Sequence, residues 1–247
     1  MLADDAARTL RDKQHEQFSP AIRLRFARQG PPVWLAHLDL MRTFERSVRR
    51  AALPVAYSRG FNPRPQLAFA LPIGTGLATI DDYVDITLTE PLDPEAAADQ
   101  LNRFLPDGLR ILAARTVSSA GPSLMSRIMA AEYQLAGAGI AAAAARLDAL
   151  PPEEPWQAEK NSKGKTITID IRPLLMNLTV EAPDQLRIRV RAGSQVNLRP
   201  DLYLAALVRL GGMDALAAAD TAITRLRLLV DDGAGNLSSP LPLPDEN

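Results

Sequence analysis

The sequence predicts a mixed α+β protein made of two successive βαββαβ units with antiparallel sheets. Three observations support this prediction. Short segments in which apolar and polar residues alternate recur along the chain and indicate half-buried strands. Between them, apolar residues at three- and four-residue intervals indicate amphipathic helices. The length of 247 residues allows two units of about 100 residues each, and a 47% hydrophobic content is typical of a globular protein.

The first unit is predicted to span residues 20–118. Residues 21–27 alternate between apolar side chains and arginines, which indicates a strand, and GPP at 30–32 ends it. A helix is predicted from His37 to Leu53, where apolar side chains recur at helical spacing. Two short strands follow at 53–58 and 66–71, on either side of the turn RGFNPRP. An alternating strand is predicted at 83–90, a helix at 95–105 after Asp93-Pro94, and a closing strand at 109–117. This order is that of a ferredoxin-like unit, with two helices on one face of the sheet.

The same order of elements begins again after a linker that is predicted at residues 119–130. The second unit is predicted to span residues 131–231 as a divergent ferredoxin-like domain, and the repeat is inferred from element order alone. Its predicted helices lie at 140–149 and 199–210. The other segments of the repeated order lie at 131–136, 154–161, 165–173, 185–193 and 222–230. Residues 1–19 are predicted to be a flexible leader and residues 232–247 a disordered tail.

The composition excludes several kinds of chemistry. The chain has no cysteine, so it cannot form disulfides or bind an iron–sulfur cluster through thiolates. It has only two histidines, His15 and His37, and neither a metal site nor a cofactor is predicted. No apolar run reaches the roughly 20 residues of a membrane helix, and the N-terminus lacks the apolar stretch of a secretory signal. We therefore expect a cytoplasmic protein without a membrane partner.

Positive charge is concentrated in the first unit, although the formal net charge of the chain is -1. Nine arginines but only two acidic residues lie between residues 23 and 64. Arginines at three- and four-residue intervals on the predicted helix form one stripe, and guanidinium groups bind phosphate well. Phe61 and Tyr57, in a loop stiffened by prolines, offer rings on which a base can stack. RNA is therefore the leading candidate ligand, and the predicted binding residues are Arg23, Arg25, Arg42, Arg46, Arg49, Arg50, Tyr57, Arg59, Phe61, Asn62 and Arg64.

Each of these features also has a purely structural interpretation. A solvated helix face explains the arginine stripe by itself, and the two aromatic rings could anchor the loop to the core. His37, near the predicted helix start, is a candidate for acid–base chemistry on a ribose hydroxyl, with a structural histidine as the competing interpretation. The acidic pairs Asp81-Asp82 and Asp231-Asp232 fall in predicted loops, where solvated turns are expected.

The segments HLDLMR, ERSVRRAALP and YSRGFNPRP, at 37–42, 45–54 and 57–65, resemble a bacterial family of unknown function that is associated with radical SAM proteins. The resemblance implies a radical SAM protein, encoded nearby, as the partner. The family usually has a small hydroxyl residue where this chain has Ala36. It usually has His or Lys near the positions of Arg64 and Gln66, so the resemblance implies no catalytic role for that loop.

The tandem layout, with a histidine near the first helix, is also similar to the RAMP-type CRISPR endoribonucleases at the level of fold. GG at 211–212 and GAGN at 233–236 match poorly the glycine-rich loop that this similarity implies. Three functions are therefore open. The first is an accessory module that binds RNA or presents a substrate to a radical SAM enzyme. The second is a metal-independent endoribonuclease that uses His37, and the third is a protein-interaction scaffold without RNA binding.

Overall fold

The computed structural model describes residues 20–119, 121–162 and 165–241. The chain divides into two compact units: unit 1 comprises Met1–Thr75, Asp82–Arg127 and Leu241–Asn247, and unit 2 comprises Gly76–Asp81 and Ile128–Pro240. The predicted leader at 1–19 and the last six residues of the predicted tail lie outside the described residues. Both units contain helices and strands, and the strands pair mostly antiparallel, which confirms the predicted mixed α+β class.

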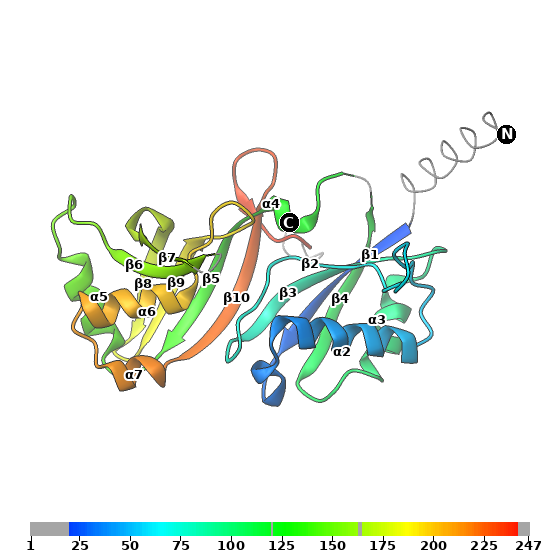
Figure 1. Ribbon diagram of the computed structural model, residues 1–247, viewed down its shortest axis with the longest axis horizontal. Helices are drawn as coiled ribbons and strands as arrows, with labels where there is room; N and C mark the ends of the chain where they lie inside the picture. Colours follow the sequence, from blue (N-terminus) through cyan, green and yellow to red (C-terminus); the bar gives the residue numbers. More distant parts are fainter. Residues whose placement is uncertain (1–19, 120, 163–164, 242–247) are drawn as a thin grey trace. The chain divides into compact units, whose positions relative to one another are not determined.

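Unit 1 follows the order strand, helix, two strands, helix, strand (Figure 1). Its strands lie in the order β4-β1-β3-β2, and β1 with β4 and β2 with β3 pair antiparallel. The elements are β1 (Pro20–Arg28), the 3-10 helix η1 (Pro31–Trp34), α2 (His37–Arg50), β2 (Leu67–Phe69), β3 (Ala78–Thr87, from Asp82 in this unit), α3 (Pro94–Asn102), β4 (Leu109–Ser118) and α4 (Leu124–Arg127).

The segment between α2 and β2 contains less strand than the sequence predicted. The strand expected at 53–58 is present only as isolated bridges at Val55 and Tyr57, and the strand expected at 66–71 is shortened to β2. Prolines at positions 54, 63 and 65 explain the difference, because proline has no N–H to donate to a ladder of hydrogen bonds.

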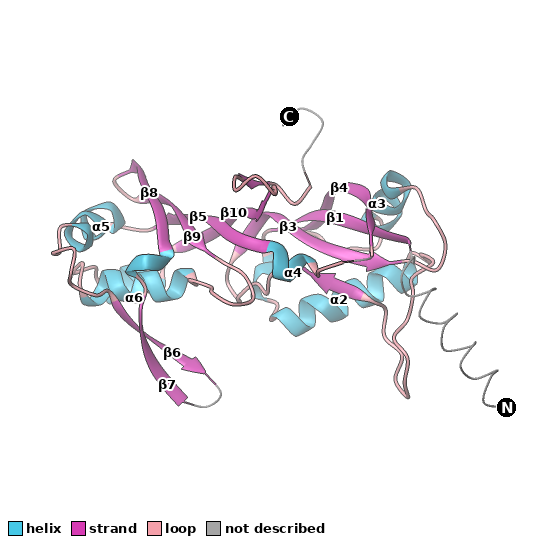
Figure 2. Cartoon of the chain, turned by 90° about the horizontal axis from the view of Figure 1, so that it is seen from above, coloured by secondary structure: helices cyan, strands magenta, loops and turns pink. Residues whose placement is uncertain are grey.

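Phenylalanine side chains hold α2 against one face of the strands of unit 1. Phe44 of α2 packs edge-to-face on Phe26 of β1 and Phe69 of β2, with ring centroids 5.1 and 5.3 Å apart. Figure 2 shows α2 on one side of β1 and β3. Since successive residues of a strand point to opposite faces, Arg23 and Arg25 of β1 lie on the face that α2 leaves uncovered.

Unit 2 has strands in the order β10-β5-β9-β8, all paired antiparallel. The first residues of β3 pair parallel with β10. A separate hairpin of β6 and β7 projects from this unit (Figure 2), and the strand β8 was missed by the sequence prediction. The elements are β5 (Ile128–Ala136), α5 (Ile140–Asp148), β6 (Gln157–Ser162), β7 (Lys165–Asp170), η2 (Arg172–Leu174), β8 (Leu175–Ala182), β9 (Gln185–Arg191), α6 (Pro200–Arg209), α7 (Ala215–Ala219), β10 (Ala222–Asp231) and β11 (Leu237–Ser238).

Asp81 and Asp82 are buried in β3, so the expectation of a solvated turn is wrong for this pair. Asp81 Oδ2 accepts a hydrogen bond from the backbone N–H of Leu228 at 3.1 Å, and Asp82 Oδ1 accepts one from the N–H of Tyr83 at 2.9 Å. Strand β3 begins earlier than its alternating pattern suggested, and it takes both carboxylates inside.

The second acidic pair behaves as predicted. Asp231 and Asp232 lie where β10 turns toward β11, and both are exposed. Asp232 Oδ1 accepts hydrogen bonds from the backbone N–H groups of Ala234 and Asn236, at 2.8 and 3.1 Å. The bond from Ala234, followed by those from Asn236, lowers the pKa of Asp232. The two carboxylates thus organise a tight exposed turn.

Tyr203 of α6 is buried, and its hydroxyl has no hydrogen-bond partner among the described residues. Burial, and secondarily the charge of Asp148, raises the pKa of Tyr203 far above the usual range of tyrosine. Because the folded-state pKa is raised, the contribution of this group to stability is complete below the unfolded-state pKa of about 10 and is lost as the pH rises above it.

We expect Tyr203→Phe to raise the free energy of unfolding at neutral pH by about 1 kcal/mol, because it deletes a buried hydroxyl without a partner. It should also reduce the loss of stability between about pH 7 and pH 11. Urea unfolding of both proteins at the two pH values measures both effects. An equal alkaline loss in the two proteins would contradict the assignment.

Candidate nucleic-acid interface

Four arginines of α2 share one exposed side of the helix. Successive residues of an α-helix are rotated by about 100°, so these four side chains fall within an arc of about 100°. The opposite side of the helix is buried and contains Leu40, Thr43, Phe44, Ser47 and Val48. We call the exposed set the α2 arginine arc; it consists of Arg42, Arg46, Arg49 and Arg50.

Most of the arc is without carboxylate partners. Arg42 Nη1 lies 3.1 Å from Asp39 Oδ1, and both side chains are more than half exposed. Exposed pairs of this kind contribute only about 0–1 kcal/mol, so phosphate can compete for Arg42. Among the residues that the structure describes, no ion pair involves Arg46, Arg49 or Arg50. Within the part of the chain that the structure describes, the arc therefore presents positive charge to solvent that is largely unpaired.

A pocket of about 340 Å³ adjoins the arc, between α2 and the segment that follows α3. Three arginines line it: Arg46 and Arg50 from the arc, and Arg103 directly after α3. No carboxylate is among its described lining residues, which also include Phe104, Leu105 and Pro106. We call this cavity the arginine pocket.

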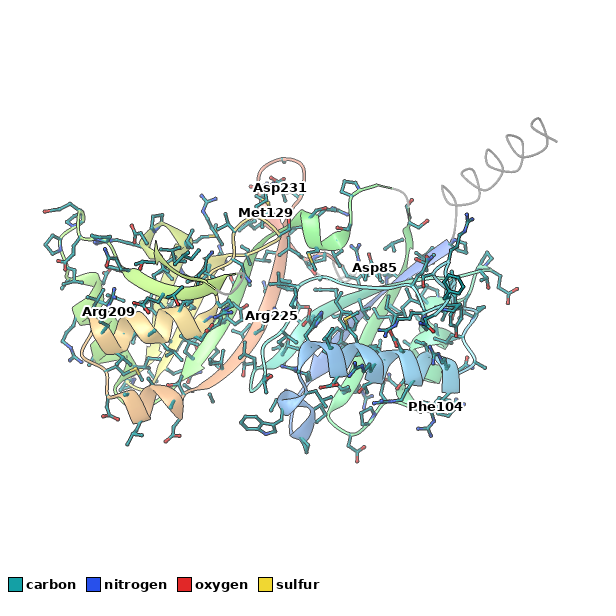
Figure 3. The ribbon with its side chains drawn as sticks, viewed as in Figure 1. Asp85, Phe104, Met129, Arg209, Arg225 and Asp231 are labelled. Atoms are coloured by element: carbon teal, nitrogen blue, oxygen red, sulfur yellow. The ribbon has the colours of Figure 1, made fainter. Side chains whose placement is uncertain are left out.

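Neighbouring groups fix the walls of the arginine pocket. The hydroxyls of Thr43 and Ser47 donate to the main-chain carbonyls of Asp39 and Phe104, at 2.8 and 3.1 Å. The guanidinium of Arg50 lies over the Phe104 ring, 5.3 Å from its centroid, and Figure 3 shows Phe104 beside the C-terminal end of α2. Arg46 Nη2 donates to the Thr43 hydroxyl oxygen at 3.2 Å, and the other arginine N–H groups of the pocket are the charged donors available to a ligand.

An exposed hairpin at residues 57–65 adjoins the other edge of the arc. Its strands are joined by a hydrogen bond from the N–H of Ser58 to the carbonyl of Arg64, at 2.8 Å. Arg64 Nη1 lies 3.9 Å from Glu45 Oε1, which places the hairpin next to α2. Phe61 is fully exposed, so its ring does not anchor the hairpin to the core, and Tyr57 is 44% exposed, so part of it faces solvent. The predicted residues Arg59 and Asn62 are exposed on the same hairpin.

The arginines of β1 are separate from this surface. Arg23 forms a bidentate pair with Asp85 of β3, Nε to Oδ1 at 2.7 Å and Nη2 to Oδ2 at 2.9 Å, and is 7% exposed. Arg25 is half-buried on the same face of the strands. Figure 3 shows Asp85 on the strands of unit 1. The structure thus brings together the predicted residues of α2 and the hairpin, and it places Arg23 and Arg25 on the opposite face of the sheet.

A larger pocket of about 600 Å³ lies over that opposite face. The Arg23–Asp85 pair is in its wall, together with Ser123 and Arg127 from the segment around α4. Because Asp85 balances the charge of Arg23, this pocket is less cationic than the arginine pocket.

His37 begins α2 and is half-buried. Its ring packs edge-to-face on Phe69, with centroids 5.5 Å apart. The N-cap position before it is Ala36, whose side chain makes no capping hydrogen bond. These contacts give His37 a role in holding the start of α2 against β2.

No group of three or more His, Asp or Glu side chains in the described ranges is arranged to hold a metal ion. In the same ranges, no helix has the length and apolar character needed to cross a membrane.

The fold and the site define a mixed α+β protein with a cationic surface built from one helix, one pocket and one hairpin. Residues 21–200 match the model of a family described as an uncharacterized protein conserved in bacteria (DUF2344). The match covers well over half of the chain, so the protein belongs to this family, which confirms the resemblance to a bacterial family of unknown function. No curated protein matches the chain.

Proposed function

We propose that the protein is a non-catalytic module that binds RNA or presents a substrate for a separate radical SAM enzyme. One observation carries the proposal: the hairpin, the α2 arginine arc and the arginine pocket adjoin one another on one side of unit 1. Single-stranded RNA offers phosphates for guanidinium groups and unstacked bases for exposed aromatic rings. The arc supplies the guanidinium groups, and Phe61 and Tyr57 supply the aromatic rings.

The radical SAM partner is proposed from the sequence motifs of α2 and the hairpin. The iron–sulfur cluster of such an enzyme requires cysteine ligands, and this chain has none, so the cluster would belong to the partner. Co-purification of the tagged protein with the radical SAM protein encoded nearby tests the association. Co-purification without any affinity for RNA would favour the scaffold function instead.

We also propose that both units are ferredoxin-like domains, the second a divergent copy of the first. In support, the two units share one strand order. When the strands of each unit are numbered in chain order, with the β6–β7 hairpin left out as an insertion, β4-β1-β3-β2 and β10-β5-β9-β8 both read 4-1-3-2. An experimental structure with a different strand order in either unit would contradict this.

Binding of single-stranded RNA should be sensitive to salt. About four phosphate contacts predict a slope of about -3 for log Kobs against log salt concentration. Fluorescence anisotropy with a labelled oligonucleotide across a salt series measures this slope. A salt-independent affinity would contradict an arginine interface, and RNA cleavage in EDTA that depends on His37 would contradict a non-catalytic role.

A further inference from the structure

We infer that the arginine pocket, with Arg46, Arg50 and Arg103, binds a terminal phosphomonoester of the RNA, whereas Arg42 and Arg49, the rest of the α2 arginine arc, bind internal phosphodiesters. This inference rests on the proposed function, since it assigns a chemical group to one part of the same surface. Neither the family description nor the sequence motifs assign any ligand to this pocket.

The charge of the pocket favours a terminal phosphate. Arg46, Arg50 and Arg103 line the pocket, and its described lining contains no carboxylate. An internal phosphodiester carries one negative charge, whereas a phosphomonoester carries about -1.5 to -2 at pH 7 because its second pKa is about 6. Three cations that repel one another are neutralised better by the more highly charged group, and guanidinium forks suit its oxygens.

The size of the pocket suits a single nucleotide. Its volume of about 340 Å³ is at the lower limit of small-ligand pockets, which are roughly 300–1,000 Å³. Leu105 and Pro106 contribute apolar surface to its wall, and Phe104 is held in place by Arg50. The volume is consistent with a single terminal nucleotide.

The dipole of α2 opposes an anion near its C-terminal end, but several groups offset it. Arg49 and Arg50 lie in the last turn, and the side-chain amide of Gln100 donates to the carbonyl of Ala51 just after it. The dipole effect is limited to the last turn and is screened by salt. The three lining arginines therefore outweigh the helix dipole in the pocket.

The order of the three parts also gives the bound strand a path. The pocket lies at one edge of the arc and the hairpin at the other, next to Glu45. A strand whose end is held in the pocket would cross the arc and reach Phe61 at the exposed hairpin. The pocket would thus set the register of the RNA on the protein.

The experiment uses one single-stranded RNA with an internal fluorophore, prepared with a 5′-phosphate, a 3′-phosphate or hydroxyls at both ends. We expect one phosphorylated form to bind the full-length protein about tenfold more tightly than the hydroxyl form. Arg103→Ala should abolish this difference. The matched control is Arg110→Ala, which removes an exposed arginine of β4 and should leave the difference intact. A nucleoside monophosphate should reduce the affinity for the phosphorylated RNA to that for the hydroxyl form and leave the affinity for the hydroxyl form unchanged. This result would show that the pocket recognises the phosphomonoester itself.

The outcomes separate this inference from the proposed function. Equal affinity for all three RNAs overturns the inference while RNA binding stands. A preference for a terminal phosphate that survives Arg103→Ala also overturns it, because another site would then hold the phosphate. If none of the RNAs binds, both the inference and the proposed function are rejected.

Discussion

Replacing Arg42, Arg46 and Arg49 together with alanine is expected to weaken the binding of single-stranded RNA by about 100-fold. Each exposed guanidinium–phosphate contact contributes about 1 kcal/mol, and a loss of about 3 kcal/mol corresponds to about two orders of magnitude in affinity. The slope of log Kobs against log salt concentration should become shallower, from about -3 to about -1, because a variant that lacks three phosphate contacts releases fewer counterions on binding. Anisotropy titrations at several salt concentrations measure both quantities.

A control with the same change in net charge shows whether position matters. Arg110, Arg191 and Arg227 are exposed on β4, β9 and β10, outside the interface. Their joint replacement with alanine removes three positive charges and should change RNA affinity by less than about threefold. If the two triple variants bind RNA equally well, the arc is not the binding surface. Far-UV circular dichroism should show that both variants are folded.

Local sequence pattern was sufficient to predict the helix that carries the interface. The apolar residues of α2 recur at helical spacing, so its register and its exposed arginines follow from the sequence, and the helix ends only three residues before the predicted boundary. Exposed aromatic rings on the hairpin were one of two interpretations that the sequence left open. The glycine and prolines indicated a turn, but they did not decide on which side its rings would lie.

Contacts between distant segments were not predictable in this way. Arg23 and Arg25 alternate with apolar residues as an exposed cationic strand face would, yet Asp85, 62 residues away, neutralises Arg23. Arg103 gave no signal, because it lies outside the arginine-rich stretch and meets Arg46 and Arg50 only after folding. Asp81 and Asp82 were assigned to a loop for the same reason, since strand partners rather than local alternation place them in β3.

Arg28 is the clearest example of an arginine with a structural rather than a binding role. It belongs to the cationic stretch of the sequence, but it is completely buried at the end of β1. Its guanidinium donates to the carbonyl of Leu35 at 3.1 Å and to that of Gly74 at 2.6 Å. The first bond fixes the chain just before α2, and the second fixes the loop that follows β2. Arg28 thus supports the helix that carries the arc without contributing to its surface.

Arg28→Met should therefore lower the free energy of unfolding by about 3 kcal/mol. Methionine retains much of the apolar volume, but the two carbonyls lose charged donors, at about 1.5 kcal/mol each. Urea unfolding followed by circular dichroism measures this as a lower midpoint with an unchanged slope. The matched control Arg110→Met, at an exposed site, should change the unfolding free energy by less than about 0.5 kcal/mol. RNA affinity of the folded Arg28→Met protein should stay close to that of the wild type. A change in stability below about 1 kcal/mol would show that water or other groups can satisfy the two carbonyls without Arg28.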